Sequence, residues 1–598
     1  MRAIVHSTTS VPGFRRLFSL VEDLRRREDR LALALSLVIG ALVGLMVVAF
    51  ILLTGRLAAH MYPAGGAAWR RVLVPTLGAL VTGILLARMF PDARGSGIPQ
   101  TRSAIFIHDG AIGMRTVIGK FLCCSASLAS GIALGREGPS VHIGAGVASV
   151  IARRLGLGTV QVRWLVPVGA SAALAAAFNT PIAAVLFSLE EIMGDLHAPI
   201  LGSVVLSSTT SWMVLHLVLG DEPLFHVPAY RLVSPSELGI YAVLGIVGGL
   251  GSVAFVKLLL RMRRWFMALP RRMAWLYPTA GGLGVGLLGW FVPQVLGVGY
   301  DQVDRVLGGD VVLSMAATLA VLKIFATALC YASGNAGGIF GPSLFIGAML
   351  GGAVGAVAER VFPGASAGPG AYALVGMGTA FAGIVRTPLT SVIMIFETTR
   401  DYTIIVPLMI SNMIAFWISQ RLQREPIYEA LARQDGIHLP TGEFREQARV
   451  LTASSAIREA PAPIDPALEA RHALEQIEGS VLDAWPVADD AGFRGMILRS
   501  RLAEAVAEGR GEVPVSALLA TGESGDEEAT AHVHGDQPLA LVLARMGETH
   551  RSVLPVVSRA DVRLLLGLVT LADVLEAYGV AGDDPGTERG EVEEGSHG

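Results

Sequence analysis

Long apolar segments recur along residues 34–420 of this 598-residue chain. A helix needs roughly 20 mostly apolar residues to cross a bilayer, and in lipid the backbone must satisfy its own hydrogen bonds. Charged residues make up 16% of the chain, below the roughly 25% of soluble domains. The sequence therefore predicts an all-α polytopic membrane domain. Its apolar runs are 34–57, 72–90, 117–134, 163–190, 199–219, 236–260, 279–298, 311–333, 344–358, 371–396 and 402–420.

The distribution of charge divides the chain into four predicted parts. They are a cytoplasmic N-terminal segment at 1–30, a transmembrane domain at 31–435, a soluble domain at 450–580 and a disordered acidic tail at 581–598. Arginines such as Arg25 and Arg26 precede the first span, which places the N-terminus in the cytoplasm. The polar tail should stay on that side, which requires an even number of crossings. We expect an integral multi-pass protein of the bacterial inner membrane with both termini cytoplasmic.

The composition also limits the classes of function that the chain can have. A net charge of −3 gives no indication of nucleic-acid binding. The three cysteines lie in apolar runs without metal-ligand spacing, which is typical of small core residues. The sequence has no nucleophile–base constellation and no phosphate-cradling loop. We therefore expect neither an enzyme nor a resident metal or cofactor.

The membrane domain contains an internal duplication. Lys120–Ala145 and Lys323–Ala348, aligned at a constant offset of 203, are identical at 12 of 26 positions. The dipeptides Thr180-Pro181 and Thr387-Pro388 form a second matching pair. Each is followed, nine residues after its proline, by a glutamate (Glu190 and Glu397). We expect two repeat halves, at about 31–220 and 234–433.

Charge placement indicates that the two halves are inverted in the membrane. Arginines precede the first span of the first half, whereas Lys257 and Arg261 follow the first span of the second half. Arg70 and Arg71 lie on the wrong side for this interpretation. Inverted repeats with interrupted helices are typical of secondary transporters, whose substrate sites lie near the bilayer midplane.

Glycine and proline break the apolar pattern at 91–99, 135–144 and 334–347. Irregular backbone is tolerated at membrane depth only where it is buried in protein or lines a cavity. Gly138-Pro139 and Gly341-Pro342 each suit a helix start. Free N–H groups and the positive end of the helix dipole converge at such starts, which favours anions.

A third break, Gly95-Ser-Gly-Ile-Pro99, has the same form, with Ser96 as the expected N-cap and a hydroxyl still able to donate outward. No acidic cluster suited to a cation follows any of the three breaks, so an anion is the predicted substrate. Glu137 precedes one predicted helix start, where its carboxylate is a tethered anion that competes with a free one. It blocks the path when ionised and can leave when protonated, which couples a proton to the anion. The plainer alternative is a structural pair with Arg136.

Four segments, in this order along the chain, resemble the signature elements of the CLC family of chloride channels and transporters. Three are loops, Gly95-Ser-Gly-Ile-Pro99, Gly135-Arg-Glu-Gly-Pro139 and Gly338-Ile-Phe-Gly-Pro342. The fourth is Tyr428 within Pro426-Ile-Tyr-Glu-Ala430. The resemblance covers roughly residues 30–435. It implies an inverted-repeat CLC-like fold with interrupted and re-entrant helices, and a homodimer in the lipid bilayer with one anion pathway per subunit.

The resemblance also implies roles for individual residues. Chloride would contact the hydroxyls of Ser96 and Tyr428 and the backbone N–H groups of Ile339 and Phe340. Glu137 matches the family's external gating glutamate, and Glu191 matches the internal proton-transfer glutamate of its exchangers. Ser96 favours chloride, since a nitrate-preferring relative would have proline there and a fluoride exporter methionine.

Keeping both Glu137 and Glu191 favours a proton-coupled chloride antiporter, with chloride and protons as its partners. A passive voltage- or pH-gated chloride channel of the same family is the alternative. A magnesium transporter is less favoured, because it needs several acidic residues in the membrane segments.

Plainer interpretations of four candidate residues remain open at this point. Glu191 could be solvated at a helix end beside Glu190, and Tyr428 could be an interfacial belt residue. The two equivalent lysines, Lys120 and Lys323, could add positive potential to the pathway or could snorkel towards the interface.

Residues 450–580 contain two weak copies of a helix–strand–strand–helix pattern that resembles a pair of CBS domains. The helices are expected at 467–478 and 537–548 and the first strands at 485–488 and 553–557. Thr570 and Asp573 are similar to the Thr-x-x-Asp element with which such domains hold a nucleotide, so an adenine nucleotide is a possible ligand. The first copy has Arg499-Ser-Arg501 instead, which makes purely structural pairing at least as good an interpretation.

Overall fold

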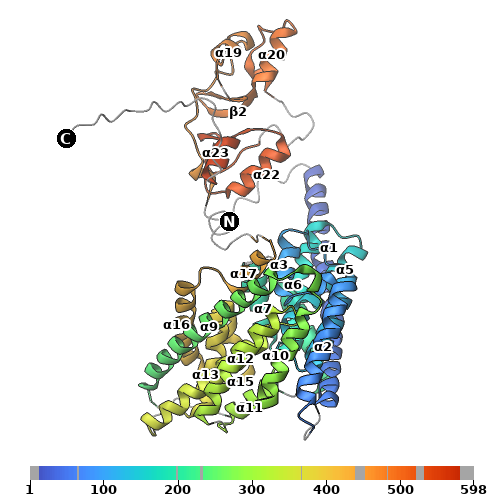
Figure 1. Ribbon diagram of the computed structural model, residues 1–598. Helices are drawn as coiled ribbons and strands as arrows, with labels where there is room; N and C mark the ends of the chain where they lie inside the picture. The colour runs from blue at the N-terminus through green and yellow to red at the C-terminus, as the bar shows by residue number, and fades with distance from the viewer. Residues whose placement is uncertain are drawn as a thin grey trace, which may run out of the picture. The chain divides into compact units, whose positions relative to one another are not determined.

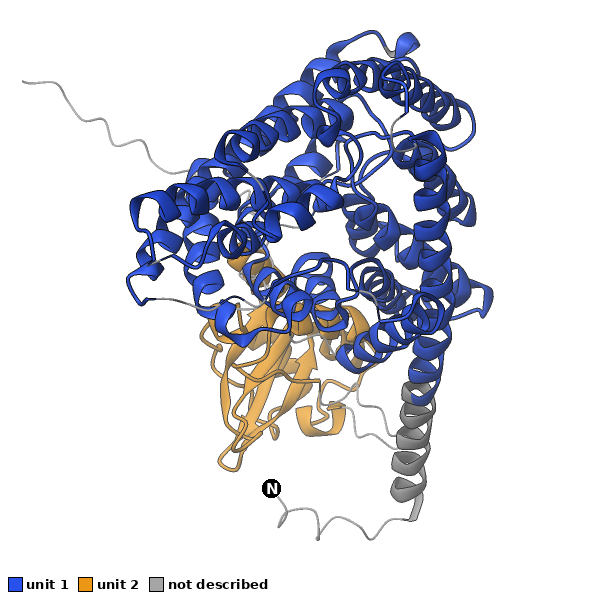
Figure 2. Cartoon of the chain, turned by 90° about the horizontal axis from the view of Figure 1, so that it is seen from below, with its two compact units in different colours: residues 1–439 blue, residues 440–598 orange. Residues whose placement is uncertain are grey.

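The chain forms two compact units, Met1–Leu439 and Pro440–Gly598, which are described separately (Figure 2). The computed structural model describes residues 12–62, 66–196, 200–221, 223–228, 230, 234–310, 312–364, 366–437, 439, 451–480, 482–519 and 531–578, with side chains from residue 30 onward except at 271. The predicted acidic tail at 581–598 lies outside the described residues, as does part of the predicted N-terminal segment at 1–30.

The first unit is built from helices (Figure 1). Eight helices of its described part are long and apolar enough to cross a membrane, by length and composition. The helices of the first half are α1 (Pro12–Met61), α2 (Arg70–Arg88), α3 (Ile98–Phe106), α4 (Met114–Ala129), α5 (Glu137–Arg154), α6 (Thr159–Phe178), α7 (Pro181–Phe187), which a π-turn η2 (Ser188–Met193) extends, and α8 (Leu201–Leu219). Those of the second half are α9 (Glu237–Ala268), α10 (Tyr277–Phe291), α11 (Tyr300–Leu307), α12 (Leu313–Ala332), α13 (Phe340–Val361), α14 (Pro369–Val385), α15 (Pro388–Thr399), α16 (Ile405–Leu422) and α17 (Ile427–Gln434).

Equivalent helices of the two halves run in opposite directions. The helices α2 and α10 are each the second of their half, and they pack antiparallel. Near the end of α2, Gly83 faces Trp275 just before α10, while Gly286 near the end of α10 faces Val72 at the start of α2. Small residues allow this close approach of two membrane helices. The predicted inverted repeat is therefore confirmed.

Matching glycines also hold each half together. A side chain at Gly144 of α5 would meet the carbonyl oxygen of Gly169 on α6 at 2.3 Å. In the second half, Gly347 of α13 faces the carbonyl oxygen of Gly376 on α14 at 2.2 Å. These two contacts fix the central helix pairs α5–α6 and α13–α14, which carry the interrupted starts of α5 and α13 into the core.

The second unit has two copies of one small α/β pattern. The first has α19 (Ala470–Gln476), β1 (Ala484–Asp489), β2 (Gly492–Leu498), α20 (Arg499–Ala507) and α21 (Val515–Leu518). The second has α22 (Leu539–Thr549), β3 (Val553–Val557), β4 (Leu565–Thr570) and α23 (Leu571–Ala577). Each copy has an antiparallel hairpin, β1–β2 or β3–β4, with its irregularity at an equivalent place, after Val487 or Val556. An additional parallel bridge joins Ile464 to Val487 in one copy and Val533 to Val556 in the other.

The two copies share a small core, because Ala484 and Met496 of the first cluster with Val553 and Leu568 of the second. The predicted twofold α/β pattern is confirmed, with element ends that differ by a few residues. The observed helices are shorter than expected at their starts, at 470 rather than 467 and at 539 rather than 537.

Candidate functional site

Two of the glycine-rich loops pair directly with each other. Gly135 N–H donates to the Gly338 carbonyl at 2.7 Å, and Gly338 N–H donates back to the Gly135 carbonyl at 2.7 Å. A side chain at Gly135 would lie 2.4 Å from the Glu137 carboxylate and 3.0 Å from the Gly341 nitrogen, so only glycine fits there. This antiparallel pair brings the starts of α5 and α13 together at the centre of the unit.

The carboxylate of Glu137 lies at the start of α13. Glu137 is completely buried, and its Oε2 accepts a hydrogen bond from Gly341 N–H at 3.2 Å. The Arg136 guanidinium is more distant, with 3.9 Å between Nε and Oε1 of Glu137. Helices α5 and α13 begin at Glu137 and Phe340, one residue before the predicted glycines. A negative group therefore occupies the N-terminal end of a helix dipole, where anions are favoured.

Tyr300 is a neighbour of Glu137 that the sequence did not single out. Its hydroxyl donates to Oε1 of Glu137, and the Arg136 guanidinium lies over its ring at 5.6 Å. Phe225 packs edge-on against the same ring with 5.2 Å between centroids. Tyr300 opens α11, and no local pattern separates it from an ordinary tyrosine at a helix start.

The predicted chloride contacts include two buried hydroxyls. Ser96 Oγ and the Tyr428 hydroxyl are both buried, and neither has a hydrogen-bond partner among the described residues. Tyr331 lies close enough to Ser96 to interact with it, but the geometry of a hydrogen bond to Ser96 Oγ is not met. Buried polar groups normally find a partner, so these two hydroxyls leave room for a ligand between the helices.

The expectation that Ser96 caps α3 is wrong. That helix begins at Ile98, and its N-cap is Gly97, whose backbone N–H donates to the Gln100 side chain at 2.9 Å. Gly97 has φ 103°, a left-handed conformation that favours glycine, and this turn displaces Ser96 from the capping position. The Ser96 carbonyl instead packs against Gly138, close to Gly338.

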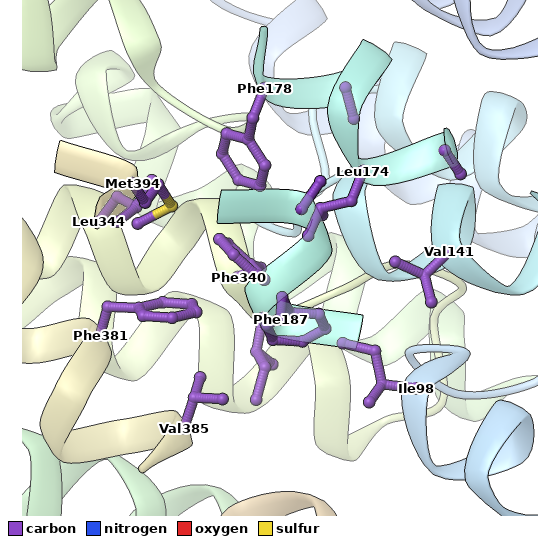
Figure 3. Close-up of a cluster of buried hydrophobic side chains, with 14 of the residues drawn as sticks. Ile98, Val141, Leu174, Phe178, Phe187, Phe340, Leu344, Phe381, Val385 and Met394 are labelled. Carbon is purple, nitrogen blue, oxygen red and sulfur yellow. The ribbon is translucent and has the colours of Figure 1, made fainter. Parts of the chain in front are cut away.

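Ile339 and Phe340 lie at the first turn of α13. Ile339 is the N-cap and Phe340 the first helical residue, so their N–H groups belong to the turn that lacks intrahelical acceptors. The Phe340 ring packs among Phe178, Phe187 and Phe381, at centroid distances of 4.5, 5.5 and 4.2 Å (Figure 3). This aromatic cluster surrounds the helix start with apolar surface, which strengthens the attraction between an anion and the N–H groups.

Glu191 is buried and paired rather than solvated. Its Oε1 accepts from Arg102 Nη1 at 2.7 Å, and Arg102 also donates to Glu429 at 3.0 Å. Tyr428 lies within electrostatic reach of both Glu191 and Glu137. The alternative of a carboxylate solvated at a helix end is therefore wrong for Glu191, and its role in proton transfer stays a prediction. The structure brings Glu137, Tyr428 and Glu191 into one region.

Glu190 takes part in a different network. Its carboxylate accepts from Thr390 N–H at 2.8 Å at the start of α15. Glu397 in turn accepts from Ile182 N–H and Ala183 N–H, both at 2.9 Å, at the start of α7. Each half thus caps a helix of the other half, which explains the repeated Thr-Pro and glutamate spacing in the sequence.

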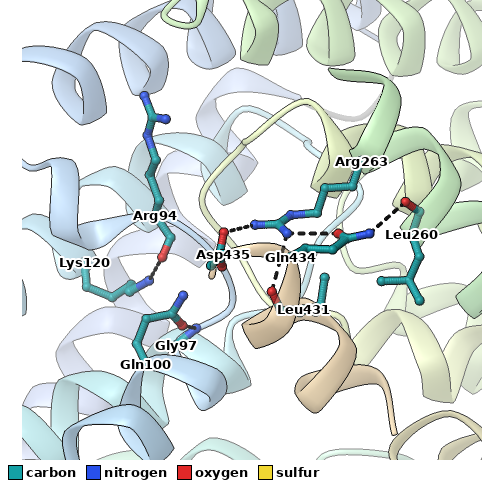
Figure 4. A network of polar contacts seen from close by, with 9 residues as sticks. All are labelled: Arg94, Gly97, Gln100, Lys120, Leu260, Arg263, Leu431, Gln434 and Asp435. Atoms are coloured by element: carbon teal, nitrogen blue, oxygen red, sulfur yellow. Dashed lines mark hydrogen bonds and ion pairs between the residues drawn. The ribbon is translucent and has the colours of Figure 1, made fainter. Parts of the chain in front are cut away.

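The two equivalent lysines hold the loops that precede the site. Lys120 donates to the carbonyls of Arg94 and Gly95, at 2.9 and 3.0 Å, just before Ser96 (Figure 4). Lys323 donates to the carbonyls of Val295 and Gly297, at 3.1 and 2.6 Å, just before Tyr300. Both side chains are completely buried, so snorkelling is excluded. Each lysine thus holds, through two carbonyl groups, a loop beside the predicted anion site.

Two cavities lie at opposite ends of α2 and α10. One cavity, of about 690 Å³, is lined at the end of α2 and the start of α10, and we call it the inner cavity because this side is predicted to be cytoplasmic. Its polar lining includes Arg94, Arg263, Arg272 and Asp435. The guanidinium of Arg263 donates hydrogen bonds to Asp435, which also lines the cavity, and to the neighbouring Gln434 (Figure 4). The outer cavity, of about 670 Å³, is lined at the start of α2 and beyond the end of α10, and includes Arg70, Arg71, Arg136, Tyr300 and Asp301.

Cationic side chains outnumber acidic ones in both cavities, which suits an anion approaching from either side. Arg70 and Arg71, which opposed the inverted interpretation of the sequence, line the outer cavity. The inner cavity reaches Gly95 and Tyr331 beside Ser96, and the outer cavity reaches Tyr300 beside Glu137. The predicted chloride contacts and the gate thus lie between the two cavities.

In the second unit, Thr570 and Asp573 bind each other. Thr570 N–H and hydroxyl donate to Asp573 Oδ2 at 2.9 and 2.6 Å, which caps α23. Arg458 also donates to Asp573 through two nitrogens, Nε at 2.8 Å among them. Burial alone would raise the pKa of Asp573, but the hydrogen bonds from Arg458 and Thr570 outweigh it and lower the pKa. This stabilisation is complete above the unfolded pKa of about 3.9 and is lost only as the pH falls through the lower folded value.

The fold and the site define a class of protein. Inverted repeats with interrupted helix starts around a buried carboxylate, between two arginine-lined cavities, are the features of an integral membrane transport protein for anions. Comparison with known proteins gives the family. A family described as voltage gated chloride channel matches residues 77–420, and a CBS domain matches residues 530–580. The chain belongs to the voltage-gated chloride channel family, which confirms the predicted CLC resemblance.

Several relatives show how far this similarity extends. An H(+)/Cl(-) exchange transporter ClcA of Vibrio campbellii is 32% identical over 382 residues, which are 63% of this chain and 81% of the relative. A putative chloride channel protein ClcB-like of Ralstonia nicotianae is 34% identical over 379 residues, 62% of this chain and 88% of the relative. The crystal structure of a slow cyanobacterial Cl-/H+ antiporter superimposes with a TM-score of 0.63 at 25% identity, and covers 68% of this chain and 97% of its own.

Proposed function

We propose that the protein is a proton-coupled chloride antiporter, gated by a glutamate that competes with chloride. The observation that carries this proposal is the Glu137 carboxylate, completely buried and bound to Gly341 N–H at the start of α13. A carboxylate held by a helix start is a tethered anion at a site suited to a free anion. The exchange transporter and antiporter among the similar proteins support the same function.

The proposed mechanism follows from this competition. Chloride from the inner cavity meets the hydroxyls of Ser96 and Tyr428 and the N–H groups of Ile339 and Phe340. The ionised Glu137 blocks the remaining path to the outer cavity. A proton on Glu137 removes its charge, so the side chain leaves the helix start and an anion replaces it. Glu191 supplies or accepts that proton on the other side of Tyr428.

A passive chloride channel is the second candidate, and the relative named a putative chloride channel supports it. A channel has no need to deliver protons to Glu137 from the inner side. The buried pair of Glu191 and Arg102 therefore favours the antiporter, because an ionisable group at such depth is costly unless it is used.

Reconstitution into liposomes tests the proposal, with chloride and proton fluxes recorded together. The full-length protein should move protons against a pH gradient when a chloride gradient drives it. Glu137→Gln should keep chloride flux and lower proton flux by at least about a hundredfold, the scale of a lost general acid–base group. Glu359→Gln, an exposed position on α13, is the matched control.

Two outcomes contradict the proposal. Proton pumping by Glu137→Gln at the control rate would show that this carboxylate is not the gate. A reversal potential of the unaltered protein that ignores the proton gradient would identify a passive channel.

Other features belong to the same proposal. We infer a homodimer with one pathway per subunit, in the bacterial inner membrane and with both termini in the cytoplasm. Binding of an adenine nucleotide by the second unit stays a prediction. Since Asp573 is already bound by Arg458 and Thr570, a ribose would have to displace that arginine.

A further inference from the structure

Three charged side chains from three separate elements meet inside the first unit. Arg102 of α3 donates from Nη1 to Glu191 of η2 at 2.7 Å and from Nη2 to Glu429 of α17 at 3.0 Å. We call Glu191, Arg102 and Glu429 the inner triad. Of these three residues only Glu191 has a role predicted from the sequence, because nothing local links residues this far apart in the chain.

Exposure is graded across the inner triad. The side chains of Arg102 and Glu191 are 5% and 7% exposed, whereas that of Glu429 is 18% exposed. Glu429 is therefore the member that water reaches most easily. It also directly follows Tyr428, a predicted chloride contact whose hydroxyl has no hydrogen-bond partner in the part of the chain that the structure describes.

The charges of the inner triad do not balance. With both carboxylates ionised, one guanidinium leaves a net charge of −1 in a buried place. An uncompensated buried charge is costly, so one proton is taken up readily to give a neutral group. Because Glu191 and Glu429 share the same guanidinium, a proton taken up there belongs to the pair rather than to either residue.

Resting on the proposed function, we propose that the inner triad is the proton acceptor at the inner end of the pathway, with Glu429 receiving the proton and Arg102 positioning both carboxylates. A hydronium ion gives its proton to a Glu429 oxygen, and Arg102 keeps its pair with the ionised Glu191. Transfer of the proton to Glu191 moves the ion pair to Glu429. Release of the proton from Glu191 towards Glu137 then restores the net charge of −1 on the inner triad.

Other ionisable groups face the inner triad but are held in place. Glu190, beside Glu191, is bound to Thr390 at the start of α15. Arg386 faces Glu429 and Glu425, while its guanidinium donates to the Ser419 carbonyl at 2.9 Å. Glu425 pairs with Arg433 on α17, and Tyr428 lies within electrostatic reach of Glu191.

Two substitutions should move the pH dependence of proton flux in opposite directions. Glu429→Gln leaves the neutral pair of Arg102 and Glu191, so protons bind less readily and the pH of half-maximal proton flux falls by about one unit. Arg102→Gln leaves two carboxylates without their cation, so that pH rises by about one unit. A charge within about 4 Å generally changes the pKa of a carboxyl group by 1–3 units, and the expected size of both effects follows from this range. Chloride and proton fluxes of the full-length protein in liposomes, at pH 5 to 8, give both values.

Two control variants distinguish a positioning role of Arg102 from a merely structural one. Arg433→Gln breaks another ion pair of α17 and should leave the pH profile unchanged. Arg102→Lys keeps the charge and should shift the profile by less than one unit, and this result tests the proposal if Arg102→Gln does not fold. A Glu429→Gln profile equal to that of Arg433→Gln, or shifts of Glu429→Gln and Arg102→Gln in the same direction, would overturn the inner triad.

Failure of the proposed function looks different. In that case Glu137→Gln or Glu191→Gln would leave proton coupling intact. If those two variants lose coupling and only Glu429→Gln behaves as its control, the antiporter stands and the inner triad does not.

Discussion

Tyr300 holds the carboxylate of Glu137 in position through a hydrogen bond. The carboxylate of Glu137 has two donors, the Gly341 N–H of α13 and the Tyr300 hydroxyl of α11. Hydrogen bonds to a charged group contribute roughly 1.5–3 kcal/mol each. Both donors favour the ionised carboxylate in the proposed blocking position, so we propose Tyr300 as a positioning residue of the predicted gate.

Tyr300→Phe should weaken the block. Without the hydroxyl the ionised carboxylate is less stable at the helix start, because it loses one hydrogen bond to a charged group, and it gives way to chloride more readily. Chloride efflux from liposomes, recorded from pH 5 to 8, should rise by about tenfold at the neutral end of this profile. Tyr402→Phe, at an exposed tyrosine, is the control, and an unchanged profile for Tyr300→Phe would remove this residue from the gate.

At the scale of elements, the helices α7 and α15 stabilise each other through reciprocal caps. Glu190 at the end of α7 and η2 caps α15, and Glu397 near the end of α15 caps α7. A carboxylate at a helix start bonds free N–H groups and complements the dipole. A single half could not form these reciprocal caps, because each cap joins a glutamate of one half to a helix of the other. The duplication therefore contributes to the stability of the fold.

Each cap can be tested on its own helix. Glu397→Ala should destabilise the start of α7 by roughly 1 kcal/mol, the usual cost of a lost N-cap, and Glu190→Ala should do the same for α15. Hydrogen exchange should speed up at Ile182 and Ala183 in the first variant and at Leu389 and Thr390 in the second. Each variant is the control for the other, and faster exchange at the same helix in both would contradict the reciprocal arrangement.

At the scale of the whole membrane unit, two cation-lined cavities approach the site from opposite ends of α2 and α10. Arg70, Arg71 and Arg136 line the outer one, and Arg94, Arg263 and Arg272 the inner one. A cavity lined mainly by positive charges raises the local concentration of anions. The loops between the cavities are held by the buried Lys120 and Lys323.

Combined Arg70→Gln and Arg71→Gln should slow chloride flux from the outer side by a few-fold to about tenfold at low ionic strength. The effect should fade when potassium gluconate is added at constant chloride, because salt screens exposed charges over about 10 Å at 0.1 M. Arg88→Gln, at the other end of α2, is the control. A loss that does not depend on ionic strength would assign these arginines a packing role.

The sequence by itself determined the class of fold, the duplication, the inversion and the interrupted helix starts. These follow from local requirements, since lipid demands long apolar helices and only glycine and proline suit the breaks. Glu137 and Ser96 could be selected because each lies in such a break, whereas Glu191 was selected through the resemblance to the CLC family. Their proposed roles in transport remain predictions.

Only the tertiary structure decided which groups meet. Tyr300 reaches Glu137 across 163 positions of sequence, and Arg102 reaches Glu429 across 327. The displacement of Ser96 from its expected cap also depends on a neighbour, because Gly97 turns to let α5 approach. Contacts of this kind arise from the packing of two inverted halves, and no local pattern along the chain specifies them.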